Sequence, residues 1–182
     1  MNATDILRHE HQIITMVLDG ADAVVTANEI HPEVIEQMVD FFRTFADGCH
    51  HMKEEKYLFP KLIEKGMSPV NGPVAVMLSE HDAGRMYLKG IAGALPGAKA
   101  HNPDAAASIR TGLRNYSAML RAHIAKENTI LFPLSDSILT PAEQSELAAA
   151  FERLETEEMG PGVHERYHQF AHDLKKAFLT QE

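Results

Sequence analysis

The sequence predicts an all-α protein: an up-down-up-down four-helix bundle with an additional C-terminal helical hairpin. Apolar residues recur at helical spacing, without the convincing alternation that is typical of strands. Proline and glycine signals divide the 182 residues into six helical segments, and residues 50–60 recur in altered form at residues 123–133. We expect a single domain over residues 1–182, with the bundle at about 4–135 and the hairpin at about 141–180.

Cap and proline signals delimit the first two helices. A cap at Thr4 or Asp5 predicts a first helix that runs to about Ala27. Pro32 suits the first turn of a second helix, which ends near residues 65–66. The apolar residues that share one face of each helix are expected to form the core: Leu7, Ile14, Leu18, Val34, Met38, Phe41, Phe42 and Phe45.

The third and fourth helices complete the expected bundle. A turn at residues 71–73, Asn-Gly-Pro, precedes a third helix from about Val74 to Leu95. Residues 96–103 begin and end with proline and are expected to form a loop. The fourth helix then follows to around Ser135.

The remaining residues predict the hairpin. Pro141 opens a shorter helix that continues to about Glu157. Residues 160–162, Gly-Pro-Gly, interrupt it, and a last helix begins at Val163. We expect this helix to end near residue 178.

Composition excludes several classes of protein. The formal net charge is -9 and no cluster of Lys and Arg rises above it, which argues against binding of nucleic acid through phosphates. Cys49 is the single cysteine, so no internal disulfide can form. No signal peptide is recognisable, and no apolar run approaches the roughly 20 residues needed to cross a bilayer. We therefore expect a cytoplasmic protein with no membrane partner.

A sequence repeat relates the first helix pair to the second. Residues 50–60 read H-H-M-K-E-E-K-Y-L-F-P, and residues 123–133 read H-I-A-K-E-N-T-I-L-F-P. Both have the form H-x-x-K-E-x-x-x-L-F-P. Glu10-His11 precedes the first copy, and Glu80-His81 precedes the second. Two related helix pairs predict approximate two-fold symmetry, which suits two metal ions at the centre of a bundle.

The spacing within the repeat points to metal binding. Residues four apart lie on one helix face about 6 Å from each other, so His50 with Glu54, and His123 with Glu127, can point into one small volume. Imidazole nitrogens and carboxylate oxygens suit iron, and also zinc or manganese. One such pair alone is more simply a helix-surface interaction, but its recurrence in the same frame favours metal. His11 and His81 are further candidate ligands, with a buried core histidine as the alternative.

Other histidines receive different interpretations. His51 and Glu55 form a competing register in the first copy, but the second copy has Ile124 and Asn128 at these positions. We therefore choose His50 and Glu54 as ligands, and expect His51 and Glu55 to be solvated or to support the ligands. Three histidines near a helix start or in loops are expected at the surface: His9, His31 and His101.

These motifs resemble the hemerythrin-like, HHE cation-binding family across roughly residues 5–135. The resemblance rests on Glu10-His11, His50-x-x-x-Glu54, Glu80-His81 and His123-x-x-x-Glu127, with their L-F-P endings. It implies two non-haem iron ions with an oxo or hydroxo bridge, held by five histidines and two bridging carboxylates. It also implies that O2 binds at an open iron position.

The chain departs from this pattern at the third helix. The invertebrate oxygen carriers look like H-x-x-x-H there, whereas Arg85 follows His81 here, and arginine cannot ligate a cation. Arg85 could instead hydrogen-bond a glutamate or a bound anion. The missing fifth histidine is expected from the last helix, where His164 lies nearest the apolar stripe and His168 is the second choice. A solvated row of histidines is the alternative.

We expect a protein that binds O2, or NO, for binding, sensing or storage. A di-iron peroxidase or catalase-like enzyme is the alternative, in which Tyr116 could donate a proton or hydrogen bond to a bound peroxide; a core tyrosine is the simpler interpretation. Iron delivery for cluster repair is weighed less, because the family's repair members carry an additional N-terminal cysteine segment. An iron-responsive regulatory module is a further possibility. The sequence leaves the oligomeric state open.

Overall fold

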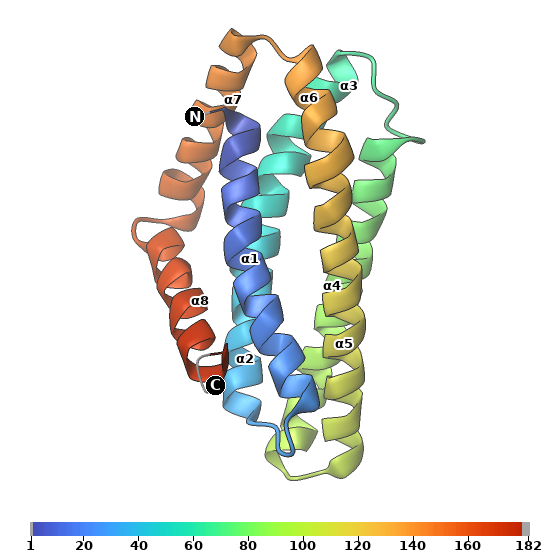
Figure 1. Cartoon of the computed structure of the whole chain (residues 1–182), viewed down its shortest axis with the longest axis vertical. Helices are drawn as coiled ribbons and strands as arrows, with labels where there is room; N and C mark the ends of the chain where they lie inside the picture. The colour runs from blue at the N-terminus through green and yellow to red at the C-terminus, as the bar shows by residue number, and fades with distance from the viewer. Residues whose placement is uncertain (1, 180–182) are drawn as a thin grey trace.

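The computed structural model describes residues 2–179, and these residues are almost entirely helical, with no strand among them (Figure 1). The prediction of an all-α bundle is confirmed to that extent. Residue 180, at the expected end of the hairpin, lies outside the described residues.

The helical elements follow in an order close to the expected one. They are α1 (Ala3–Thr26), α2 (Pro32–Phe41), η1 (Phe42–His51), η2 (Glu54–Leu58), α3 (Phe59–Glu64), α4 (Pro73–Lys99), α5 (Pro103–Lys126), η3 (Glu127–Leu131), α6 (Phe132–Ile138), α7 (Pro141–Arg153), η4 (Leu154–Met159) and α8 (Val163–Leu179). The η segments are π-helical. They continue the neighbouring α-helices, so that residues 32–64 form one rod and residues 103–138 form another.

The start of α1 differs from the expectation. Asn2 is the N-cap, and the Asp5 carboxylate accepts a hydrogen bond from the Asn2 backbone N–H at 3.2 Å. Thr4 is buried inside the helix, where its hydroxyl donates to the Asp136 carboxylate at 2.5 Å. A short hydroxyl side chain can therefore tie α1 to α6 instead of capping its own helix.

The expected loop at residues 96–103 is largely wrong, because α4 continues through Pro96 to Lys99. Pro96 cannot donate a backbone hydrogen bond. It lies in the last turn, however, and the Ala100 N–H still bonds to its carbonyl at 3.1 Å. Only the short connection between Lys99 and Pro103 breaks the helix.

Two apolar clusters fill the bundle. The larger contains Ile14, Phe41, Phe42, Phe45, Leu88, Leu113 and Tyr116, among others. The smaller contains Leu7, Leu58, Phe59, Met77, Leu131 and Phe132, together with Phe151 from α7. Each fully buried side chain of this size contributes roughly 1.5–3 kcal/mol to stability. Consecutive long helices meet the two clusters in opposite orders along the chain.

The hairpin α7–α8 packs on the side of the bundle formed by α1 and the second helix (Figure 1). The Gln144 side chain accepts a hydrogen bond from the Ala3 N–H at 3.0 Å, and the Tyr167 hydroxyl donates to Asp40 at 2.8 Å. The opposite side of the bundle, along α4 and α5, has no such cover within the described residues. None of the helices in the described part carries an apolar stretch long enough to cross a bilayer.

Candidate metal centre

The two L-F-P endings shape the helices beside the candidate ligands. The Phe59 N–H bonds to the Glu54 carbonyl, and the Phe132 N–H bonds to the Glu127 carbonyl, five residues back in each case. The next residue is proline in both copies. Since a proline ring crowds the carbonyl four residues before it and lacks an N–H, regular α-helical bonding cannot continue there. Each bridging-glutamate candidate thus begins a short π-helical segment, a feature often found at functional sites.

Buried histidines and glutamates converge between the two apolar clusters. One group that could hold an ion consists of His11, His50, Glu54 and Glu127. A second consists of Glu54, His81, His123 and Glu127, and a third of His51, His81 and His123. In each group the candidate donor atoms lie within 4.8 Å of one another. The two glutamates belong to both four-residue groups, so the site can hold two ions side by side.

The glutamate oxygens are divided between the two histidine pairs. Glu54 Oε1 lies 3.8 Å from His50 Nε2, and Glu54 Oε2 lies 3.4 Å from His81 Nε2. Glu127 Oε2 lies 3.1 Å from His11 Nε2, and Glu127 Oε1 lies 3.1 Å from His123 Nε2. Each carboxylate therefore turns one oxygen to each side, which would suit a carboxylate shared by two cations.

Most of these atoms lack hydrogen-bond partners, which tests whether metal ions fit; His11 Nε2 and His50 Nε2 instead lie 3.0 Å from each other. Both oxygens of Glu54 and Glu127 are buried and unpartnered, as are the Nε2 atoms of His51, His81 and His123. Buried polar groups without partners destabilise a fold by roughly 1–3 kcal/mol each. Divalent or trivalent cations would satisfy all of these donor atoms at once, and neutral imidazole with carboxylate is a donor set that suits iron. The residues fit the metal pair.

A second layer of residues fixes the histidine rings. Each of the five buried histidines uses Nδ1 to meet an oxygen, and these pairs are His50–Glu10 at 2.9 Å, His123–Glu80 at 3.0 Å, His81–Glu55 at 2.7 Å, His11–Asn128 at 2.9 Å and His51–Asp47 at 3.3 Å. Donation from Nδ1 leaves the Nε2 lone pair free and directs it to the centre.

The lysine of the repeat completes this layer. Lys53 Nζ binds both Glu10 and Glu155, and Lys126 Nζ binds Glu80. Each copy of the E-H and H-x-x-K-E motifs therefore encodes three candidate ligands, one carboxylate that holds the histidine of the next helix, and one ammonium that holds this carboxylate. The sequence repeat thus corresponds to the same set of His–Glu and Lys–Glu contacts in both copies.

The central groups differ in their electrostatics in the absence of metal. Against the effect of burial, the Glu127 carboxylate raises the pKa of His123, and His123 and His11 hold the pKa of Glu127 well below its usual range. Burial lowers the pKa of His50 to about 4, with the neighbouring His11 adding to the effect. Burial and the nearby Glu127 carboxylate raise the pKa of Glu54 well above its usual range. Neutral imidazoles are ready ligands, and bound cations would remove the repulsion between the two carboxylates.

A further group, Glu10, Cys49 and Glu155, also has ligand spacing. The Lys53 ammonium already lies against both of its carboxylates, so the place of a cation is filled. Burial, and next the Glu10 carboxylate, raise the pKa of the Cys49 thiol to about 12, which makes it an inert residue.

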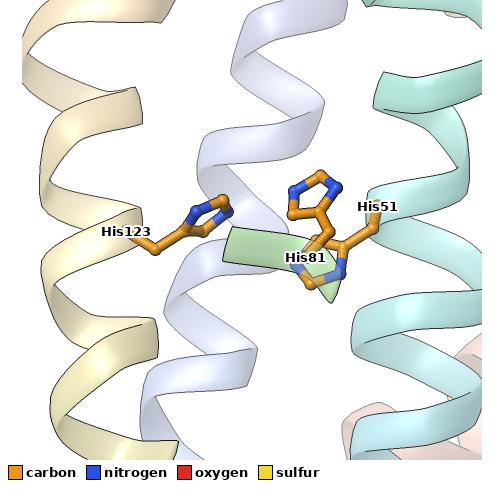
Figure 2. Close-up of side chains that lie close together, drawn as sticks. All are labelled: His51, His81 and His123. Atoms are coloured by element: carbon orange, nitrogen blue, oxygen red, sulfur yellow. The ribbon is translucent and has the colours of Figure 1, made fainter. Parts of the chain in front are cut away.

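The structure brings together six of the seven metal ligands that the sequence suggested: His11, His50, Glu54, His81, His123 and Glu127. Of the two roles expected for His51, solvated or supporting the ligands, the solvated one is wrong. Its side chain is only 5% exposed, and its ring stacks on that of His81 with the centroids 3.8 Å apart. Figure 2 shows the rings of His51, His81 and His123 meeting between their helices. Asp47, four residues earlier, was the available signal, since a carboxylate at that spacing can hold a helical histidine.

His164 does not join the other candidates. Its Nε2 lies 3.6 Å from Glu10 Oε1 and 3.9 Å from Glu155 Oε1, and its side chain is 23% exposed. The ring of His168 lies beside it at 4.4 Å. Because α8 packs on the outside of α1, its histidines reach the second layer around Glu10 and not the atoms at the centre.

Arg85 and Tyr116 lie close to His51 and His81. Arg85 donates to the Glu55 carboxylate at 2.7 Å, so the expectation that it bonds a glutamate is confirmed. Glu55 in turn holds His81, which is the supporting role considered for it. Tyr116 is buried against Phe42. It also lines a cavity of about 10 Å³, together with His51, His81 and Arg85. Burial raises the pKa of the Tyr116 hydroxyl, which therefore stays protonated.

Comparison with known proteins identifies two kinds of bacterial relative. The chain is 24% identical over 164 residues to the uncharacterized protein Rv1995 of Mycobacterium tuberculosis, with 88% of this chain and 64% of the relative covered. It is 32% identical over 139 residues to the iron-sulfur cluster repair protein YtfE of Escherichia coli O157:H7, with 69% and 59% covered. The chain thus spans less than two thirds of the length of these relatives. No solved structure matches it significantly.

A family model matches the residues that form the bundle. The model for the hemerythrin HHE cation binding domain matches residues 2–135, which include both copies of the repeat and every residue of the buried centre. Since this match covers most of the chain, the protein belongs to the hemerythrin HHE cation-binding domain family.

Proposed function

We propose that this protein holds two iron ions at the buried centre and binds O2, or another small diatomic molecule such as NO, for sensing or storage. The observation that carries the proposal is the division of the Glu54 and Glu127 oxygens between two histidine pairs. His11 and His50 would hold one ion, and His81 and His123 the other. The iron pair, when bound and reduced, would supply the electrons and the binding position for the small molecule.

The composition of the centre favours reversible binding over cleavage of the O–O bond. The nearest ring nitrogens belong to histidines, which carry no negative charge, so only Glu54 and Glu127 bring negative charge into direct reach of the ions. A shell with little negative charge stabilises highly oxidised iron less well than a carboxylate-rich shell. The apolar clusters on both sides exclude water and would slow loss of electrons to solvent.

The order of contacts along the chain supports an up-down-up-down arrangement of the four long helices. Consecutive long helices meet the two apolar clusters in opposite orders, as they do in an up-down-up-down bundle. We propose this topology for residues 4–135, with the hairpin α7–α8 as part of the same domain. The hairpin supplies Glu155 to the buried Lys53, so it belongs to the support of the centre.

Two observations favour alternative activities. The similarity to a protein named for iron-sulfur cluster repair favours iron delivery. The position of Tyr116 beside the cavity near His51 and His81 favours reaction with peroxide, in which the hydroxyl could donate a proton. Both alternatives use the same residues, and they differ in the fate of the iron and of the small molecule.

Spectroscopy of the iron-loaded protein tests the proposal. We expect about two iron ions per chain, and a visible absorption band that appears when O2 is added to the anaerobically reduced protein. Removal of O2 under argon should abolish the band, and renewed O2 should restore it over several cycles. Rapid consumption of hydrogen peroxide that is lost in Tyr116→Phe, or transfer of iron to an apo iron-sulfur protein, would replace the proposal with one of the alternatives.

A further inference from the structure

One histidine makes the two halves of the centre unequal. We propose that His51 is a third histidine ligand of the ion held by His81 and His123, so that this ion binds three imidazoles and its neighbour binds two. The inference rests on the proposed iron pair. It assigns to that pair a residue that is not part of the pattern shared by the two copies of the repeat.

The first support is the placement of ring nitrogens. One ring nitrogen from each of His51, His81 and His123 lies within 4.8 Å of the other two. The three Nε2 atoms are buried without a hydrogen-bond partner. The His51 ring stacks on His81 at an interplanar angle of 14° and meets His123 at 75° (Figure 2). Three inward-facing nitrogens with no partner are costly as a core arrangement and are what one cation requires.

The second support is a chain of polar contacts that orients His51. Asp47 accepts from His51 Nδ1 at 3.3 Å, and Asp47 is itself held by Arg85, with Arg85 Nη2 2.8 Å and Nε 3.0 Å from Asp47 Oδ1. A histidine fixed through Nδ1 by a carboxylate presents Nε2 as the ligand. Arg85 therefore acts on this side as a positioning residue for His51.

The third support is the comparison of the two copies within the chain. The repeat aligns His51 with Ile124 and Asp47 with Leu120, and the preceding helices align Arg85 with Thr15. All other central ligands have a matching residue in the other copy. The polar series Arg85, Asp47 and His51 exists on one side only, where it leads to His81 and His123. In the other copy Thr15, Leu120 and Ile124 take these positions, and none of them carries a charge or an imidazole.

The replacement His51→Ile tests the assignment. Isoleucine is chosen because Ile124 is buried at the equivalent position, so the bundle accommodates this side chain. His172→Ile is the matched control, since it removes an exposed histidine of α8 that lies outside the centre. The measurements are iron per chain during titration with Fe²⁺ and the Mössbauer spectrum of the loaded protein.

In the parent protein we expect two iron sites with different Mössbauer signals. In His51→Ile, the iron concentration that half-saturates the second site should rise by at least about tenfold, and only one of the two signals should change. His172→Ile should match the parent in both measurements. If His51→Ile fails to fold, His51→Gln serves instead, because its amide can still donate to Asp47 but offers no imidazole nitrogen.

The results distinguish failure of the proposed iron pair from failure of the His51 assignment. A parent protein that binds no iron pair would overturn the proposed function. A parent with two irons, together with His51→Ile or His51→Gln variants of unchanged affinity and spectrum, would overturn the role of His51 alone. Loss of one iron in His164→Ile with retention of both in His51→Ile would assign the ligand to α8.

Discussion

Glu10 accepts a hydrogen bond from His50 Nδ1 at 2.9 Å, although the two residues lie on different helices. Glu80 and His123 repeat this relationship at 3.0 Å. In both helix pairs the glutamate directly precedes a central histidine. One turn of helix therefore carries a candidate ligand and also orients the candidate ligand of the following helix. The repeat in the sequence therefore corresponds to a repeated hydrogen-bonded link between helices.

The two glutamates of this link should differ in their contribution to stability. Lys53, which binds Glu10, is 0% exposed, whereas the side chain of Lys126, which binds Glu80, is 37% exposed. Glu10→Gln leaves a buried ammonium with Glu155 as its remaining ion-pair partner, and we expect a loss of about 3–5 kcal/mol in the free energy of unfolding. Glu80→Gln should cost below about 1 kcal/mol. Urea unfolding of both metal-free variants measures the difference, and equal losses would contradict it.

Glu54→Gln should stabilise the metal-free protein but weaken its binding of iron. Burial and the Glu127 carboxylate raise the pKa of Glu54, so this group favours the fold at acidic pH and loses that contribution as the pH rises through its raised pKa. In metal-free protein above pH 7, the variant should melt a few degrees higher than the parent. It should also bind less iron. Thermal melts with and without iron test both statements, and a lower melting temperature of the metal-free variant would be inconsistent with the electrostatic argument.

Acid should loosen α8 through His168. Burial, and next the neighbouring His164 and His9, lower the pKa of His168 from 6.5 to about 4, while Glu10 acts in the opposite direction and His172 in the same. A histidine with a lowered pKa stabilises the fold fully above pH 6.5, and this contribution is lost as the pH falls through about 4. Contact of His164 with Glu10 raises the pKa of His164, which adds a positive neighbour in the same range.

His168→Leu should therefore flatten the decrease in stability between pH 6.5 and 4. Urea unfolding across this range provides the measurement. His172→Leu is the control, because His172 is exposed on the same helix. A slope that His168→Leu leaves unchanged, or that His172→Leu abolishes equally, would show that another group is responsible.

Gly20→Ala should disturb the packing of α8 on α1. A Cβ at position 20 would lie 2.6 Å from Leu174 Cδ2 and 3.0 Å from its Cγ. Gly93, inside α4, offers a control with no atom within 4 Å of the added carbon. Gly93→Ala should gain up to about 1 kcal/mol from helix propensity. Gly20→Ala should be less stable than this control by about 1–3 kcal/mol. Urea unfolding of the two variants checks the sign, and equal stabilisation would argue against close contact.

Local patterns predicted most of the helices and the symmetric part of the centre. His50 with Glu54, and His123 with Glu127, were predicted as pairs because a helix fixes the direction of residues four apart. The end of α4 was mispredicted, because Pro96 is tolerated where the helix has few bonds left to lose. His51 was misplaced for a different reason. Its neighbour His50 is also inward-facing, and only the approach of α4 with His81 and Arg85 encloses it.

The sequence by itself determined the all-α class, the duplicated helix pair and the six residues that recur in it, because these depend on spacing along one helix. The tertiary structure alone decided that His51 is buried beside His81, that His164 stays with Glu10, and that Lys53 is enclosed while Lys126 is not. These outcomes depend on which helices approach one another and on what the hairpin covers. Spacing within a single helix carries no record of distances between helices.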